Sequence, residues 1–212
     1  MPCGPGWRKP ARRSRLDGLR EHGLVAGGYD RRVTEELDVL KLVAARLDAA
    51  NFPYMLTGSM AANYYAVPRM TRDIDLVVEL SVSDTDRLCA LFEDFYLDPD
   101  AVRAAIAGRT SFNAIHTTSV VKVDFMVRKD SQYRHEELRR RRRVALDETT
   151  ISVVAPEDLI ISKLDWARDT RSPVQLADVR NLLVTVPDLD ATYLARWIAH
   201  LGLDALYREV TR

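Results

Sequence analysis

The stretch TGSMAANYYAVPRMTRDID, residues 57–75, decides how the rest of the chain is interpreted. The apolar run at residues 52–57 predicts a buried strand that stops at Gly58-Ser59. Residues 60–66 then predict a helix that ends before Pro68, because the residue before a proline is disfavoured in helical geometry. Residues 73–79 predict a second strand, and since side chains alternate along a strand, Asp73 and Asp75 share one face.

The aspartate pair predicts a metal site. Adjacent carboxylates on one strand face are costly unless a cation lies between them, although an exposed strand face is the simpler alternative. Mg²⁺, with Mn²⁺ as an alternative, suits such oxygen ligands. Asp124 is a third candidate, because residues 120–128 alternate so that it faces away from the core. If that strand pairs beside residues 73–79, the sequence predicts that Asp73, Asp75 and Asp124 converge.

Gly58 and Ser59 are candidates for binding a phosphate. A glycine and a serine between a strand and a helix offer free backbone N–H groups and a hydroxyl. The chain has no GxGxxG or Walker lysine at this point, which argues against a Rossmann or P-loop protein. The four histidines are scattered without the spacing of zinc ligands.

The element pattern predicts an α/β (α+β) protein with a mixed sheet, followed by a helical C-terminal region. We expect a basic, flexible arm at residues 1–32, an α/β core at 33–154 and a helical part packed on it at 155–212. Helices are expected from Thr34 to Asn51, from Ala155-Pro156 and from Ser172-Pro173. A capping box of Ser83 and Asp86 predicts a helix through about Phe95, and residues 110–128 predict a β-hairpin.

Composition narrows the class of protein. With 212 residues, 47% of them hydrophobic, the chain can bury a substantial core and is not expected to be disordered. No apolar run approaches the roughly 20 residues that cross a bilayer, and the start of the sequence does not resemble a secretory signal. Cys3 and Cys89 suggest no disulfide framework, so a cytoplasmic, reducing location is expected.

Positive charge is concentrated in two places, although 31 basic residues balance 31 acidic ones. Residues 1–32 hold eight basic and three acidic groups, and residues 128–143 hold the same numbers, which gives each segment +5. The second segment contains five consecutive arginines, Arg139, Arg140, Arg141, Arg142 and Arg143. Such a run on a helix is either a stripe that binds the phosphates of a nucleic acid or a solvated face.

These motifs together resemble a known superfamily. Gly58-Ser59, then Asp73-Ile74-Asp75, then Asp124 on a later strand is similar to the nucleotidyltransferase superfamily of the DNA polymerase β type. The form Arg-x-Thr-x-Asp-Ile-Asp-Leu at residues 69–76, with the later Lys163 and Asp178, is most similar to AbiEii-like toxins, including the mycobacterial MenT group. The likeness covers about residues 34–185.

The resemblance implies a Mg²⁺-dependent transfer of an NMP from an NTP to a hydroxyl, with a tRNA 3′ end as the expected acceptor, by the toxin of a toxin–antitoxin pair. It implies that Asp73 and Asp75 bind metal, with Asp124 as third carboxylate and general base. Gly58, Ser59, Thr71, Arg72 and Lys163 would bind the nucleotide, and Asp178 would be a further essential acid. The tRNA would bind at Arg139–Arg143, and a cognate antitoxin would be a protein partner.

Alternatives remain at several points. The acceptor could be a protein side chain or an aminoglycoside-like hydroxyl, and the chain could be a non-catalytic nucleotide- or RNA-binding module of the same fold. From its position on an amphipathic helix alone, Lys163 could be a boundary lysine that reaches water. Asp178 could lie on a solvated face or pair with Arg171 or Arg180.

Overall fold

The structure is a computed structural model that describes residues 29–212. Most of the predicted basic arm, residues 1–28, lies outside the described part. The centre is a seven-stranded mixed sheet in the order β3-β4-β5-β2-β1-β7-β6. Its strands are β1 (Tyr54–Leu56), β2 (Ile74–Val78), β3 (Phe95–Tyr96), β4 (Ser111–His116), β5 (Lys122–Val127), β6 (Arg142–Leu146) and β7 (Thr149–Val153). Parallel pairing of β2 with β5 and of β1 with β7 makes the sheet mixed, which confirms the predicted fold class.

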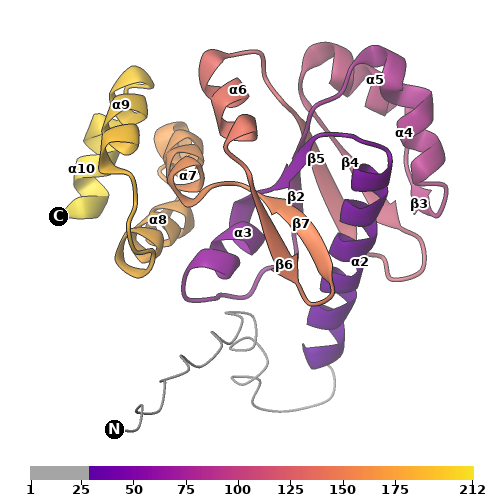
Figure 1. Ribbon diagram of the computed structural model, residues 1–212, viewed down its shortest axis with the longest axis horizontal. Coiled ribbons are helices and arrows are strands. Elements are labelled where there is room, and N and C mark those ends of the chain that lie inside the picture. Colours follow the sequence, from indigo (N-terminus) through magenta and orange to yellow (C-terminus); the bar gives the residue numbers. More distant parts are fainter. Residues whose placement is uncertain (1–28) are drawn as a thin grey trace, which may run out of the picture.

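Helices surround this sheet (Figure 1). They are α2 (Tyr29–Ala49), α3 (Gly58–Tyr65), α4 (Thr85–Leu91), α5 (Pro99–Gly108), α6 (Gln132–Arg139), α7 (Pro156–Thr170), α8 (Pro173–Thr185), α9 (Ala191–His200) and α10 (Asp204–Thr211), with a short 3-10 helix at Val82–Asp84. Helices α7 to α10 gather on the left in Figure 1, and α4 and α5 lie on the right. Helix α3 packs against β2, α7 and α8, so it joins the sheet to the C-terminal helices.

Alternation along two central strands builds the core. Ile74, Leu76 and Val78 of β2 are fully buried, as are Val123 and Phe125 of β5. Phe125 also stacks on Phe112 of β4 with ring centroids 5.0 Å apart. Because one face of each strand is committed to this apolar layer, the polar residues between them point to the opposite face, as the sequence predicted.

Several helix boundaries differ from the prediction, and α3 begins at Gly58 although the sequence predicted a helix over residues 60–66. Helix α2 begins at Tyr29 and not at Thr34, since residues 29–33 contain neither glycine nor proline to stop it after Gly27-Gly28. The capping box consists of Ser81 and Asp84, because the chain is extended at Ser81 directly after β2, so the box opens the 3-10 helix. Helix α4 then ends at Leu91 and residues 95–96 form β3. Within residues 29–212, no helix is both long and apolar enough to cross a membrane.

Candidate active site

The carboxylates at the centre of the sheet come from neighbouring strands. Asp75 and Asp124 are direct partners in the parallel register of β2 and β5, so their backbones lie about 4.8 Å apart. Asp73 is exposed and directly precedes β2. Burial, together with the nearby negative charges of Asp124 and Asp73, raises the pKa of Asp75 to about 6. This crowding of like charge is what a bound cation relieves.

Gly58 and Ser59, the first two residues of α3, make up the glycine–serine turn. Gly58 packs directly against the carboxylate of Asp75. Gly58 has a left-handed backbone, with φ at +65°. A Cβ added to Gly58 would lie 2.0 Å from Oδ2 of Asp75. The backbone N–H of Thr57 also donates to the carbonyl oxygen of Asp75 over 2.9 Å. Glycine is therefore required here both by the backbone conformation and by the approach of Asp75.

A network of charged side chains lies on the other side of this turn. The guanidinium of Arg69 donates to Oγ of Ser59, and through Nε (2.8 Å) and Nη2 (2.9 Å) to both carboxylate oxygens of Asp178. Nζ of Lys163 donates to Oδ2 of Asp178 over 2.8 Å and to Oε1 of Gln175 over 3.0 Å. The network connects the Ser59 turn to helices α7 and α8.

Both buried members of the network differ from the simpler alternatives that the sequence left open. Lys163 is only 3% exposed and Asp178 6%, so neither lies on a solvated face. Asp178 pairs with Arg69 and Lys163, whereas Arg171 pairs with Glu209. Burial lowers the pKa of Lys163. Burial opposes ionisation of Asp178, but the hydrogen bonds from Arg69 and Lys163 outweigh it and lower the pKa of that carboxyl.

The two sides of the site act on each other. The positive charge of Lys163 partly offsets the rise in the pKa of Asp75. On the strand side, Nζ of Lys122 lies 2.7 Å from Oδ2 of Asp124. Lys122 therefore supplies the local counter-charge for Asp124.

Three residues of the site were not predicted from the sequence: Arg69, Lys122 and Gln175. Arg69 stood in the quoted motif without a role, although it lies in the segment that must return from α3 to β2. Lys122 precedes Asp124 by two residues, and the strand period that places Asp124 also puts Lys122 on the same face. Gln175 precedes Asp178 by three residues on α8, a spacing that brings side chains together on a helix.

A cleft of about 450 Å³ opens beside Asp73. It is bordered by α2, by the segment before β2 and by the turn between β4 and β5. Its lining residues are Glu35, Glu36, Arg72, Asp73, Ser119, Val120, Val121 and Lys122. Arg72 thus lies with Asp73 in this cleft. Thr71 is half-buried between these residues and Arg69.

The donor set fits Mg²⁺ as a cation bound by few protein ligands. Among residues 29–212, no group of three or more histidine, cysteine, aspartate or glutamate side chains lies so that it could hold a metal ion. Mg²⁺ commonly takes one or two carboxylates and completes its octahedron with water and substrate phosphates. The register-paired Asp75 and Asp124, with their crowded charge, provide such a pair. A three-ligand set that includes Asp73 remains a prediction.

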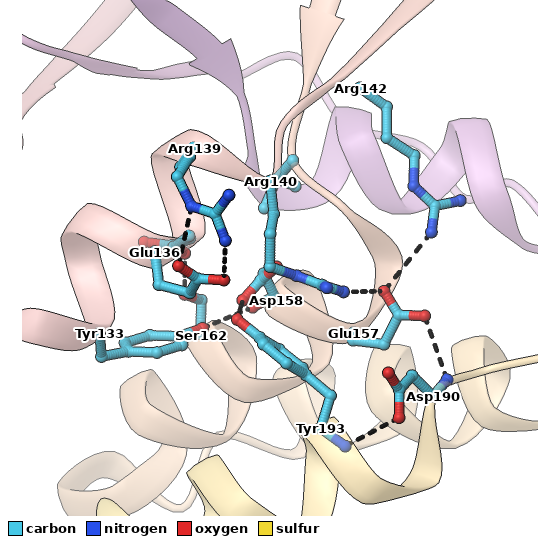
Figure 2. Close-up of polar contacts among 12 residues, drawn as sticks. Tyr133, Glu136, Arg139, Arg140, Arg142, Glu157, Asp158, Ser162, Asp190 and Tyr193 are labelled. Atoms are coloured by element: carbon cyan, nitrogen blue, oxygen red, sulfur yellow. Dashed lines mark hydrogen bonds and ion pairs between the residues drawn. The ribbon is translucent and has the colours of Figure 1, made fainter.

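The arginine run is not a continuous stripe on a helix. It spans the end of α6 and the start of β6, and each arginine contacts a partner within the protein. Arg140 donates to Oδ2 of Asp158 and to Oε2 of Glu157, both over 3.0 Å, as Figure 2 shows. Arg142 lies 3.6 Å from Glu157. The remaining contacts are those of Arg139 with Glu136, Arg141 with the Leu138 carbonyl and Arg143 with Asp48.

These contacts hold the C-terminal helices in place. Tyr193 of α9 donates to Asp158 over 2.6 Å, and the backbone N–H of Asp190 donates to Glu157 over 3.2 Å (Figure 2). Glu157 and Asp158 are buried at the start of α7, so Arg140 neutralises charge that would otherwise be costly. Acidic side chains from other elements therefore engage Arg140, Arg142 and Arg143, whereas Arg139 pairs with Glu136 of its own helix and Arg141 donates to a backbone carbonyl. The expectation of a continuous helical stripe is wrong, and binding of tRNA by these arginines stays a prediction.

Comparisons with known proteins bear on the fold. No protein-family model matches the chain, and no curated protein matches it in sequence. Among solved structures, the chain is similar to an antigenic nucleotidyltransferase-like protein from Paracoccidioides brasiliensis, with 19% identity over 82% of this chain and 93% of that one and a TM-score of 0.52. It is also similar to ANT(2'')-Ia in complex with adenylyl-2''-tobramycin, with 16% identity over 83% and 98% of the two chains and a TM-score of 0.50.

Likeness at this level of identity concerns the fold. Both structures match over nearly their whole length. The described part of this chain has a mixed sheet with helices packed around it. The chain therefore has a nucleotidyltransferase fold, which confirms the fold expected from the resemblance.

Proposed function

We propose that the protein transfers an NMP from an NTP to a hydroxyl group of an acceptor. The supporting observation is the register pairing of Asp75 with Asp124, together with the close approach of Gly58 to the Asp75 carboxylate. The carboxylates would hold Mg²⁺, with Asp73 as a further ligand. Bound Mg²⁺ supplies charge neutralisation for the phosphates of the nucleotide.

The side chains of the protein then divide the work. Backbone N–H groups at the start of α3 and the hydroxyl of Ser59 bind triphosphate oxygens, and Lys163 adds a positive charge. Thr71 and Arg72 border the nucleotide. Asp124 accepts the proton of the acceptor hydroxyl after the ammonium of Lys122 has moved away from the Asp124 carboxylate. Catalysis is supplied by orientation and by charge placed in advance, with pyrophosphate as the leaving group.

The test is transfer of label from radioactive NTPs in the presence of Mg²⁺. Wild-type protein is incubated with each α-labelled NTP and with total tRNA, a protein extract or aminoglycosides as acceptors. We expect labelled product with wild type and none with Asp75→Ala. The matched control is Asp169→Asn, which removes an exposed carboxylate on α7 away from the site. If Asp75→Ala labels the same product as wild type, the proposal fails.

For the acceptor, we propose the 3′ end of a tRNA, with the protein acting as a toxin that a cognate antitoxin restrains. This finer proposal is supported by the similarity of residues 69–76, Lys163 and Asp178 to AbiEii-like toxins. The arginine run supports it less than the sequence suggested, because internal carboxylates engage Arg140 and Arg143. Label that enters tRNA only at its 3′ end, and growth arrest that a neighbouring small gene relieves, are the expected results.

A second acceptor class is favoured by the cleft beside Asp73. Three acids, Glu35, Glu36 and Asp73, line it against two bases, Arg72 and Lys122, and this excess of one negative charge favours an amino group over a phosphate backbone. One protein of similar fold has been seen with an adenylylated aminoglycoside. A small amino-hydroxyl acceptor is therefore the alternative. Modified drug with unlabelled tRNA in the same assay would favour it.

A further inference from the structure

Arg69 joins the serine of the turn to the buried acid of the C-terminal helices. Its guanidinium donates to Oγ of Ser59 and, with two nitrogens, to Asp178. Nη1 also donates to the carbonyl oxygen of Met70 over 3.2 Å. The side chain is 36% exposed, although Asp178 beneath it is almost fully buried. One face of the network is thus open to a ligand at Ser59, and the other is anchored in the protein.

The charges of the network do not cancel. Asp178 carries one negative charge and is shared by two cations, Arg69 and Lys163, whose donor nitrogens lie 2.8 Å from its oxygens. By themselves the three groups carry one net positive charge beside Ser59, and the negative charges of Asp73 and Asp75 also act on Arg69 and Lys163. Two cations gathered at the Ser59 hydroxyl suit an anionic ligand that carries its own Mg²⁺.

The geometry of Asp178 does not suit proton transfer or metal binding. Arg69 donates to both of its carboxylate oxygens, and Lys163 adds a further bond to Oδ2. These bonds lower the pKa of Asp178, so the group stays ionised. A carboxylate held in this way fixes the positions of its two donors, as second-layer acids do for other functional side chains.

We propose that Arg69 binds the triphosphate together with Ser59, and that Asp178 is a positioning residue that holds Arg69 and Lys163 in place. This inference rests on the proposed function, because it assigns roles within the same nucleotide site. The planar guanidinium suits it, since a fork of N–H groups can keep one carboxylate and still donate to a phosphate oxygen. Lysine at position 69 could satisfy only part of this geometry.

The test is equilibrium binding, which does not depend on knowing the acceptor. Calorimetry measures the Kd of each Mg-NTP and of Mg-tripolyphosphate, a probe that lacks the base. Variants are Arg69→Gln, Arg69→Lys, Asp178→Asn and the double variant Arg69→Gln/Asp178→Asn. The matched control is Arg46→Gln, which breaks a two-point arginine–carboxylate pair with Asp94 away from the site. Urea unfolding identifies any variant that is not folded.

Arg69→Gln should weaken binding of both ligands by roughly ten- to hundredfold, the usual range for a lost charge-assisted hydrogen bond. The Kd of Arg69→Lys should lie between the values for Arg69→Gln and wild type. Arg69→Lys also replaces Arg69→Gln as the test variant if the latter does not fold. Asp178→Asn should weaken binding in the wild-type background but add little to Arg69→Gln, because both changes disable the same guanidinium. Arg46→Gln should bind as wild type does.

Three outcomes are distinguishable. If wild type binds no NTP, the proposed function fails, and this inference fails with it. If wild type binds but Arg69→Gln binds equally well, only the role of Arg69 is overturned. If Asp178→Asn leaves Kd unchanged and lowers only the rate of transfer, or if its effect on Kd is the same with and without Arg69, Asp178 is not a positioning residue.

Discussion

Replacing Gly58 by alanine tests whether the turn is packed against Asp75 as the structure has it. The change has two separable costs. An alanine at φ +65° adopts a left-handed backbone, which costs about 1–2 kcal/mol. Its Cβ would also lie 2.0 Å from Oδ2 and 2.8 Å from Cγ of Asp75, so the aspartate must leave its rotamer at a further cost of about 0.5–1.5 kcal/mol.

Gly202 provides the matched control. It has nearly the same backbone, with φ at +66°, but nothing lies within 4 Å of a Cβ added there. Gly202→Ala should therefore show the backbone cost alone, and Gly58→Ala should lose roughly 1 kcal/mol more in urea unfolding. Gly58→Ala should also lower transfer by about a hundredfold, because it displaces a carboxylate of the site. Gly202→Ala should not.

A third variant ties the excess cost to the carboxylate. In an Asp75→Ala background the two closest contacts are gone, but the Cβ of residue 75 still lies 2.9 Å away. Gly58→Ala should then cost less than it does in the wild-type background, yet still more than Gly202→Ala. Equal losses for Gly58→Ala and Gly202→Ala in the wild-type background, with activity retained, would refute the packing of the turn against Asp75.

Three further predictions concern charge. Lys122→Met removes the counter-charge of Asp124, so Mg²⁺ should bind roughly two- to fivefold more tightly by calorimetry, and unchanged affinity would contradict the pairing. Burial raises the pKa of Asp158 from 3.8 to about 6, so its ionisation should cost stability as pH rises from about 4 to 6, by at most about 3 kcal/mol. Asp158→Asn should remove this part of the pH dependence in urea unfolding, and parallel curves for the two proteins would count against it. Arg140→Gln should lower the free energy of unfolding by about 3 kcal/mol because it leaves buried carboxylates unneutralised, whereas Arg139→Gln, an exposed residue, should leave the unfolding midpoint unchanged.

Features that depend on the alternation of side chains along a strand could be predicted from the sequence. Alternation in β2 and β5 placed Asp75 and Asp124 on the face opposite the core, and the structure confirms that placement. The exact partnership of the two aspartates is a matter of strand register, which depends on how β2 and β5 align after β3 and β4 have been inserted between them in the chain.

Partnerships between distant charges could not be predicted in the same way. The sequence predicted correctly that Glu157 and Asp158 stabilise the start of α7. Their burial beneath Arg140 could not be predicted, because it depends on how α7 packs. Arg69 posed the same difficulty, because its partner Asp178 follows it by 109 residues. A run of charged residues in a sequence shows how much charge is present, but tertiary packing determines which partners those side chains contact.

The division of the site between sheet and C-terminal helices has a consequence for synthesis. The strands that carry Asp75 and Asp124 are complete at Val127, whereas Lys163 and Asp178 belong to α7 and α8. A nascent chain leaving the ribosome therefore has its paired carboxylates before Lys163 and Asp178 exist. Under the proposed function, a nucleotide could be captured only after α7 and α8 have folded.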